Sequence, residues 1–330
     1  MRMPVVAVAV CLAVLSAGCG AEVAPSPDSK AASSVTLTNC GHKVTYDKVP
    51  ERVVTNDVGI TELMFALGLE DRMAGFAMPD DKGDLDGVPW KDGYDKVKWL
   101  SKDQLTKENV LDARADWVFA GWNYGFREDS DFTPDALTKL GIPSYILTES
   151  CRNGRTETSR GIMPPLDALY EDLTNLGKLF GVEKRAVALI ADFKREVAEV
   201  KAKAPSDSPK VFLYDSGEDQ PFTSGRYAAP DQIISEAGGN NVMHDLKDSW
   251  TTVGWETVVE RNPDVIVICD YGDVSAEQKK KFLLSYAPLR NVSAIKHKRI
   301  FTLDYVDLVE SPRNPSAIAR LGKYLRTTTP

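Results

Sequence analysis

Apolar and polar residues form two kinds of pattern along the chain, and both patterns occur in each half of it. Short apolar runs are typical of buried strands, whereas apolar residues that recur every three or four positions are typical of one face of a helix. Strands are predicted at 35–39, 43–47, 52–55, 72–77, 116–121, 143–147, 210–214, 265–269 and 299–303. Helices are predicted between them at 60–69, 134–140, 230–237, 255–261, 276–285 and 315–325. This alternation predicts mainly parallel sheets with helices on both faces.

The middle of the chain is predicted to be helical. One apolar stripe ends at Gly181, and a second covers 183–203 with no Gly or Pro inside it. At 1.5 Å per residue, the second helix is a rod of roughly 30 Å. A rod of that length could brace two lobes, and a surface helix of one domain is the alternative. We predict an α/β fold with two Rossmann-like lobes, at 35–182 and 205–330, joined by a single long helix at 183–204.

Residues 1–19 indicate an export signal. Arg2 precedes the apolar run 4–15, which at about a dozen residues is too short to span a bilayer. Three small residues stand immediately before Cys19, as a lipoprotein signal peptidase requires. We predict that a lipid on Cys19 anchors the mature chain to the cell membrane outside the cytoplasm, and an ordinary secretory peptide is the alternative. Residues 20–34 are rich in Ala, Ser and Pro and predict a flexible tether.

Composition and charge exclude several classes of function. A net charge of −8 with no basic stripe argues against nucleic-acid binding. The motifs of serine hydrolases, zinc proteases and phosphate-binding loops are missing from the sequence, which predicts that the chain is not an enzyme. A secreted hydrolase and a lipid-anchored protein-interaction module are the alternatives from other classes.

The cysteines outside the leader and the anchor predict one disulfide. Export permits disulfides, and we expect Cys40 to pair with Cys151, which leaves Cys269 as a buried thiol. The cysteines and the three histidines show no metal-ligand spacing, so we expect no directly bound metal and no cofactor.

Aromatic residues and arginines gather on loops that follow the predicted strands. Clefts in parallel sheets form where loops leave the carboxyl ends of the strands. Flat rings suit a planar or bulky chelate, and arginine suits carboxylates, hydroxamate oxygens or phosphate. The candidate ligand-binding residues are Trp122, Tyr124, Arg127, Tyr214, Arg226, Trp250, Tyr271, Tyr305 and Arg313.

Several segments resemble the iron-chelate and cobalamin-binding proteins of bacterial ABC importers. They lie at 50–54 (PERVV), 61–69, 140–143 (LGIP), 237–241 (AGGNN), 255–256 and 262–267 (NPDVIV), and the match runs from about residue 40 to the end. The resemblance implies two lobes linked by one long helix, small lobe movements and a ligand in the cleft between the lobes. It also implies that Glu62 and Glu256, one in each lobe, dock on arginines of a membrane permease. Ordinary acids of a helix start are the alternative for these two residues.

The resemblance also implies the class of ligand. A ferric siderophore is expected first, with haem, a corrinoid or a deazaflavin cofactor precursor as alternatives. The segment 250–256 and the paired cysteines resemble members of the family proposed to take up the deazaflavin precursor. Haem would need an axial ligand, for which Tyr124, Tyr214 and Tyr271 are candidates. We expect a monomer that captures its ligand and delivers it to the permease.

Overall fold

The computed structural model describes residues 34–78, 82–154 and 160–328. The predicted signal peptide, the anchor Cys19 and nearly all of the predicted tether lie outside the described residues. Among the described residues, no helix combines the length and the apolar character needed to cross a bilayer.

The N-terminal lobe is built on a parallel six-stranded sheet in the order β5-β4-β3-β6-β7, with β8 also paired to β6. Its strands are β3 (Val53–Asn56), β4 (Met73–Ala77), β5 (Trp99–Ser101), β6 (Trp117–Trp122), β7 (Gly125–Phe126) and β8 (Ser144–Ile146). Its helices are α1 (Val58–Ala66), α2 (Gly93–Lys96), α3 (Lys107–Asp112) and α4 (Pro134–Lys139), with short 3₁₀ turns η1 (Glu70–Arg72) and η2 (Thr148–Ser150). An antiparallel hairpin of β1 (Val35–Asn39) and β2 (His42–Tyr46) lies at its side.

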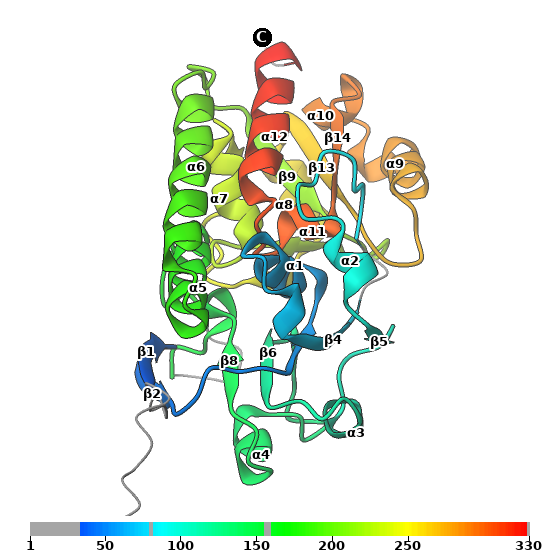
Figure 1. The fold of residues 1–330 in the computed structure, drawn as a ribbon. Coiled ribbons are helices and arrows are strands. Elements are labelled where there is room, and N and C mark those ends of the chain that lie inside the picture. The colour runs from blue at the N-terminus through cyan, green and yellow to red at the C-terminus, as the bar shows by residue number, and fades with distance from the viewer. Residues whose placement is uncertain (1–33, 79–81, 155–159, 329–330) are drawn as a thin grey trace, which may run out of the picture.

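The C-terminal lobe repeats this plan with a parallel four-stranded sheet in the order β11-β9-β13-β14. Its strands are β9 (Lys210–Tyr214), β11 (Asn240–Asn241), β13 (Val265–Asp270) and β14 (Ile300–Asp304), and β10 (Phe222–Ser224) pairs with β12 (Trp250–Thr252) in a separate antiparallel ribbon. Its helices are α7 (Ala229–Glu236), α8 (Trp255–Arg261), α9 (Ala276–Ser285), α10 (Ser293–Lys296), α11 (Tyr305–Leu308) and α12 (Asn314–Thr328), with a 3₁₀ turn η3 (Ala287–Leu289). The two-lobed α/β fold predicted from the sequence is confirmed (Figure 1).

Two long helices connect the lobes, α5 (Pro165–Phe180) and α6 (Glu183–Lys201), and α6 runs along one side of the molecule (Figure 1). Near the start of α6, Arg185 donates a hydrogen bond to the carbonyl of Ala66 in the N-terminal lobe (2.9 Å). Near its end, Lys201 pairs with Glu236 in the C-terminal lobe (2.9 Å). The helix α5 also contacts both lobes, through β1 and α7, so the brace is wider than the single rod expected.

One hydrophobic core runs through both lobes. Buried side chains from β3 and α1 continue through α5 and α6 to β9 and α12 in a single cluster. Burial of a continuous apolar surface opposes separation of the lobes, because opening them would expose it to water.

Candidate functional site

A cavity of about 480 Å³ lies between the two lobes. Its N-terminal side is formed where β6 and β8 end, and its C-terminal side by the loops after β9, β13 and β14 and by the β10–β12 ribbon. This is the carboxyl edge of both parallel sheets, where the topology predicts a ligand site. The lining residues are Trp122, Asn123, Tyr124, Glu149, Ser150, Arg160, Asp215, Phe222, Asp248, Ser249, Trp250, Tyr271 and Tyr305.

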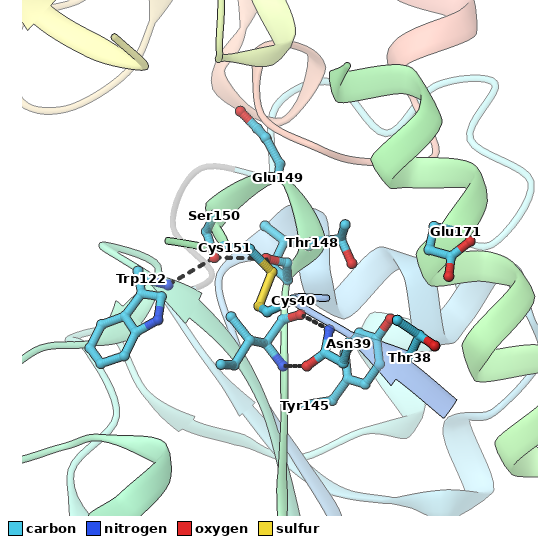
Figure 2. The surroundings of a disulfide bond; sticks show 12 residues. Thr38, Asn39, Cys40, Trp122, Tyr145, Thr148, Glu149, Ser150, Cys151 and Glu171 are labelled. Carbon is cyan, nitrogen blue, oxygen red and sulfur yellow. Dashed lines mark hydrogen bonds between the residues drawn. A yellow bond between two sulfur atoms is a disulfide. The ribbon is translucent and has the colours of Figure 1, made fainter. Parts of the chain in front are cut away.

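A tight turn at the end of β6 brings Trp122 and Tyr124 to the cavity. Asn123 has a left-handed backbone (φ 69°), and Gly125 (φ 116°) lies so close to Asn56 that an added Cβ would be 2.8 Å from its Cγ. Only glycine adopts that conformation without strain, so Gly125 fixes the course of the turn. The amide of Trp122 donates to the hydroxyl of Ser150 (2.9 Å), which ties the turn to η2 (Figure 2).

The structure joins Cys40 to Cys151 by a disulfide, with the two Cα atoms 5.3 Å apart. Cys40 follows β1, and Cys151 directly follows the cavity residues Glu149 and Ser150 (Figure 2). The bond therefore fastens the β1–β2 hairpin to the segment that forms the floor of the cavity. The other cysteine of the described chain, Cys269, is buried at the end of β13.

Five of the predicted ligand-binding residues line the cavity: Trp122, Tyr124, Trp250, Tyr271 and Tyr305. Two pairs of rings stack in its C-terminal wall, Tyr271 on Tyr305 with centroids 4.3 Å apart and Phe222 on Trp250 with centroids 5.9 Å apart. The rings offer flat apolar surfaces to a ligand. Their contact with a ligand stays a prediction.

Two hydrogen bonds cross from one lobe to the other beside the cavity. The indole of Trp250 donates to the hydroxyl of Tyr124 (3.1 Å), and the hydroxyl of Tyr305 donates to the carboxylate of Asp57 (2.7 Å). Burial raises the pKa of Tyr124 and Tyr305 well above the ordinary value, and Asp57 adds to both shifts. Both phenols are therefore neutral at physiological pH.

Three other predicted ligand-binding residues are not in the lining of this cavity, and their contact with a ligand stays a prediction. Arg127 is 3.8 Å from Asp129 on the surface of the N-terminal lobe. Arg226 donates to the ring of His244 (2.8 Å). Tyr214 ends β9 on the face that packs against the helices, where its ring centroid is 5.7 Å from that of Trp255.

The fourth misplaced residue, Arg313, pairs with Glu62, and this one contact overturns two predictions. Arg313 donates to both carboxylate oxygens of Glu62, at 2.8 Å from its Nε and through Nη2. Trp90 (2.9 Å) and Tyr94 (2.6 Å) donate to the same carboxylate. Glu62 has no exposed surface, so it cannot meet a permease arginine, and Arg313 cannot meet a ligand in the cavity. Every residue of α1 is buried, because the C-terminal lobe covers the face that a sequence pattern assigns to solvent.

The remaining predicted docking residue, Glu256, is exposed in the first turn of α8. Its surface position permits the predicted contact with a permease, which stays a prediction.

The charged residues that line the cavity are not among the ligand-binding residues predicted from the sequence. Glu149, Asp215 and Asp248 bring three carboxylates, against the single guanidinium of Arg160. Asp215 directly follows β9, where strand ends predict site residues, but the ligand chemistry inferred from the sequence favoured aromatic residues and arginines. Arg160 lies in an irregular segment without a sequence signal.

Glu149 belongs to a cluster of buried carboxyl groups at the junction of the lobes. Its carboxylate accepts the amides of Ala229 (3.1 Å) and Glu310 (3.2 Å), and its own amide donates to Glu310 (3.0 Å). Asp172 of α5 adds a third carboxyl group, which accepts the hydroxyl of Tyr145 (2.7 Å). Burial raises the pKa of Glu149 to about 7 and that of Asp172 to about 6. Burial and the neighbouring Asp172 raise the pKa of Glu310 well above its ordinary value.

These shifts predict that the folded protein loses stability as pH rises from 5 to 7.5. A carboxyl group whose pKa is higher in the folded state stabilises the fold below its unfolded pKa, near 4 to 4.5, and that stabilisation is lost as pH rises through the folded pKa. The window is therefore about pH 4.5 to 7. We expect a fall of about 2–4 kcal/mol in the free energy of unfolding, measured by urea denaturation at both pH values.

The substitution Glu310→Gln is the control for that experiment. It removes one titrating group while keeping the shape of the side chain, so it should raise stability at pH 7.5 and flatten the pH dependence. Equal stability of the unmodified protein at both pH values would contradict the prediction.

Two α/β lobes braced by long helices around an aromatic cavity define a class, the two-lobed solute-binding proteins. The sequence profile described as periplasmic binding protein matches residues 53–306. An uncharacterised ABC transporter substrate-binding lipoprotein of Bacillus subtilis, YvrC, is 25% identical over 332 residues, which cover 96% of this chain and 95% of the relative. The vitamin B12-binding protein of Yersinia pestis is 24% identical over 219 residues, or 66% and 69% of the two chains.

A solved structure agrees with the fold. A protein of an ABC-type Fe³⁺-hydroxamate transport system from Saccharomonospora viridis superimposes with a TM-score of 0.73 at 22% identity, over 88% of this chain and 98% of the other. The chain belongs to the periplasmic binding protein family. It is an extracytoplasmic solute-binding protein of an ABC transporter, with a small molecule as ligand and a membrane permease as partner.

Proposed function

We propose that the cavity binds a ferric hydroxamate chelate of neutral or positive charge and that the protein delivers it, chemically unchanged, to the permease. The charge of the lining carries this proposal. Asp215 and Asp248 bring two carboxylates to the cavity, and Glu149, whose pKa burial raises to about 7, adds a partial negative charge, against the one guanidinium of Arg160. Three hydroxamate groups balance the charge of Fe³⁺, whereas three catecholate groups leave a trianion that the carboxylates would repel. The description of the Saccharomonospora viridis structure names the same class of chelate.

The geometry disfavours two alternative ligands. A volume of about 480 Å³ suits a drug-sized molecule, and a corrinoid with its nucleotide loop is larger. Haem would need an axial ligand. Of the three candidates, Tyr124 is neutral and engaged in a cross-lobe hydrogen bond, and Tyr214 lies outside the cavity. Only Tyr271 lines the cavity, with its ring stacked on that of Tyr305.

Arg160 favours one second candidate. A buried guanidinium in an aromatic cavity fits the phosphate of a flat anionic molecule such as a deazaflavin cofactor precursor. That ligand and the ferric hydroxamate differ in charge, so a binding experiment separates them.

Quenching of tryptophan fluorescence tests the proposal. A ferric trihydroxamate should quench the chain saturably, and haem, cobalamin, a ferric tris-catecholate and a phosphate-bearing deazaflavin should not at the same concentration. Trp250→Ala should weaken binding at least about tenfold, because it removes a stacked ring from the wall. Trp99→Ala is the matched control, because Trp99 is 48% exposed on β5 and outside the cavity. Tight binding of the deazaflavin phosphate alone would replace the first candidate by the second.

We further propose that a lipid on Cys19 anchors the protein and that Glu108 and Glu256 dock on the permease. Glu108 is the second residue of α3 and Glu256 the second residue of α8, and both are exposed. The two helices precede the central strands β6 and β13 of their sheets. The two acids therefore hold corresponding positions, each in the first turn of the helix that precedes an inner strand of its sheet. Glu108 thus takes the role that the sequence assigned to Glu62.

Charge reversal tests the docking. The double substitution Glu108→Lys with Glu256→Lys should weaken the complex with the permease at least about tenfold and leave ligand affinity unchanged, because opposite charges across an interface become like charges. Glu199→Lys, on the exposed face of α6, is the control. Co-purification with the permease in detergent measures the effect. Retention of full complex formation by the double variant would contradict the assignment of these acids.

A further inference from the structure

Asp215 is a nearly buried acid in the wall of the cavity. It directly follows β9, it is 6% exposed, and it belongs to the lining. Its amide donates to the carbonyl of Phe222 (3.0 Å), and the amide of Phe222 donates to the carbonyl of Ser216 (2.8 Å). These two backbone hydrogen bonds fix the acid beside Phe222, whose ring stacks on that of Trp250 in the same wall.

One carboxylate oxygen of Asp215 accepts no hydrogen bond within the described chain. The hydroxyl of Ser216 donates to Oδ1 (2.6 Å), which leaves Oδ2 as the free acceptor. Oδ2 is not among the fully enclosed polar atoms that lack a partner, so it keeps some accessible surface. Because Asp215 lines the cavity, a donor on a ligand can approach this oxygen.

The charge of Asp215 is not balanced by a cation of the described chain. Within the described ranges, it forms no ion pair with a lysine, arginine or histidine. An aspartate that is almost fully buried is normally paired, because removing a charge from water costs free energy. Asp215 therefore offers a negative charge for which a ligand can supply the partner.

The other two acids of the cavity have partners. Burial lowers the pKa of Arg160, and Asp248 and Glu149 act in the opposite direction, so both acids lie close to its guanidinium. The carboxylate of Glu149 also accepts the amides of Ala229 (3.1 Å) and Glu310 (3.2 Å), one at each oxygen. Of the three acids in the lining, Asp215 is the one that remains to bind a cationic group.

The hydrogen bonds of Asp215 select the kind of cationic group. A guanidinium is a planar fork that matches both oxygens of a carboxylate, but Ser216 already occupies Oδ1. An ammonium group is a compact charge with three donors, and it can bind through one oxygen. The methylene chain that carries an ammonium group also suits the apolar rings of Phe222 and Trp250 beside the acid.

We propose that the ligand carries a pendant ammonium group in addition to its ferric trihydroxamate core and that Asp215 binds this group. The inference rests on the proposed function, because it assigns one part of the same ligand. The ferric core is neutral, so the ammonium group gives the ligand its positive charge. The protein therefore prefers chelates with a free amine to uncharged chelates of the same size.

A matched pair of chelates tests this inference. Ferrioxamine B is a linear ferric trihydroxamate that ends in a free amine, and acetylation of the amine removes the charge without changing the ferric core. We expect the amine form to quench tryptophan fluorescence with a dissociation constant at least about tenfold below that of the acetylated form, the effect of one hydrogen bond to a charged group. Asp215→Asn should make the two dissociation constants nearly equal.

Asp219→Asn is the matched control. Asp219 is exposed in the same loop and does not line the cavity, and its substitution changes the net charge by the same amount. This variant should keep the preference for the amine form. Thermal melting checks that both variants fold.

Two results would overturn the inference alone. They are equal quenching of the unmodified protein by both chelates, and a preference for the amine form that persists in Asp215→Asn. Absence of saturable quenching by either chelate would overturn the proposed function, and the inference with it. The titration therefore distinguishes the failure of one proposal from the failure of the other.

Discussion

Replacing Arg313 by alanine should lower the free energy of unfolding by about 3–5 kcal/mol, the range for breaking a buried ion pair by removing one partner. The carboxylate of Glu62 would remain fully buried without its guanidinium, and the donors Trp90 and Tyr94 cannot balance its charge. The pair also joins α1 of one lobe to the segment before α12 of the other, so the loss should loosen the lobe contact. Urea denaturation of the variant measures the effect.

An exposed ion pair provides the comparison. Arg195 pairs with Asp192 on the surface of α6 with both side chains more than half exposed, so Arg195→Ala should change stability by less than about 1 kcal/mol. The double substitution Glu62→Ala with Arg313→Ala should cost less than the sum of the two single ones, because it leaves no buried charge. A loss below about 1 kcal/mol for Arg313→Ala would show that the pair is not held in the buried state.

Replacing Cys40 and Cys151 by serine should lower the free energy of unfolding by about 4–5 kcal/mol in the chain-entropy description. The bond closes a loop with a sequence separation of 111 residues, which restricts the unfolded chain strongly. Ligand affinity should fall as well, because Cys151 directly follows Glu149 and Ser150, and Ser150 holds the turn of Trp122 (Figure 2). Denaturation curves and the fluorescence titration measure the two effects.

A reducing agent distinguishes the disulfide from the substitution itself. Reductant should destabilise the unmodified protein and leave the serine variant unchanged. The hairpin keeps a second attachment, because Asn39 exchanges two hydrogen bonds with the backbone of Ile146 (2.8 and 3.0 Å). A reduced protein as stable as the oxidised one would show that this attachment alone suffices.

The sequence predicted the elements whose signals are local. The strands β9 and β13 are short apolar runs between turn residues, and both lie within one residue of the predicted bounds. The strand pair β10–β12 and the helix α3 were not predicted. Three-residue strands and a six-residue helix carry too short a pattern, and they form because the surrounding fold supplies their partners.

The sequence predicts those residues of the candidate site that stand at the ends of strands or directly after them. Trp122 ends β6, Tyr271 directly follows β13, and Tyr305 directly follows β14, so the topology brings all three to one edge. Arg313 was misplaced because its partner comes from a distant segment. Arg313 meets an acid 251 positions away, and no periodicity in either segment records that contact. Glu62 failed for the same reason.

Direct contacts hold the two lobes together. Two helices, a buried ion pair and two hydrogen bonds beside the cavity connect one lobe to the other. We expect such a body to close little when a ligand binds. The permease must prefer the ligand-bound protein to the free protein, and we expect no large lobe movement by which it could distinguish the two. We therefore expect the permease to recognise the bound ligand itself, where the ligand forms part of the protein surface at the opening of the cavity.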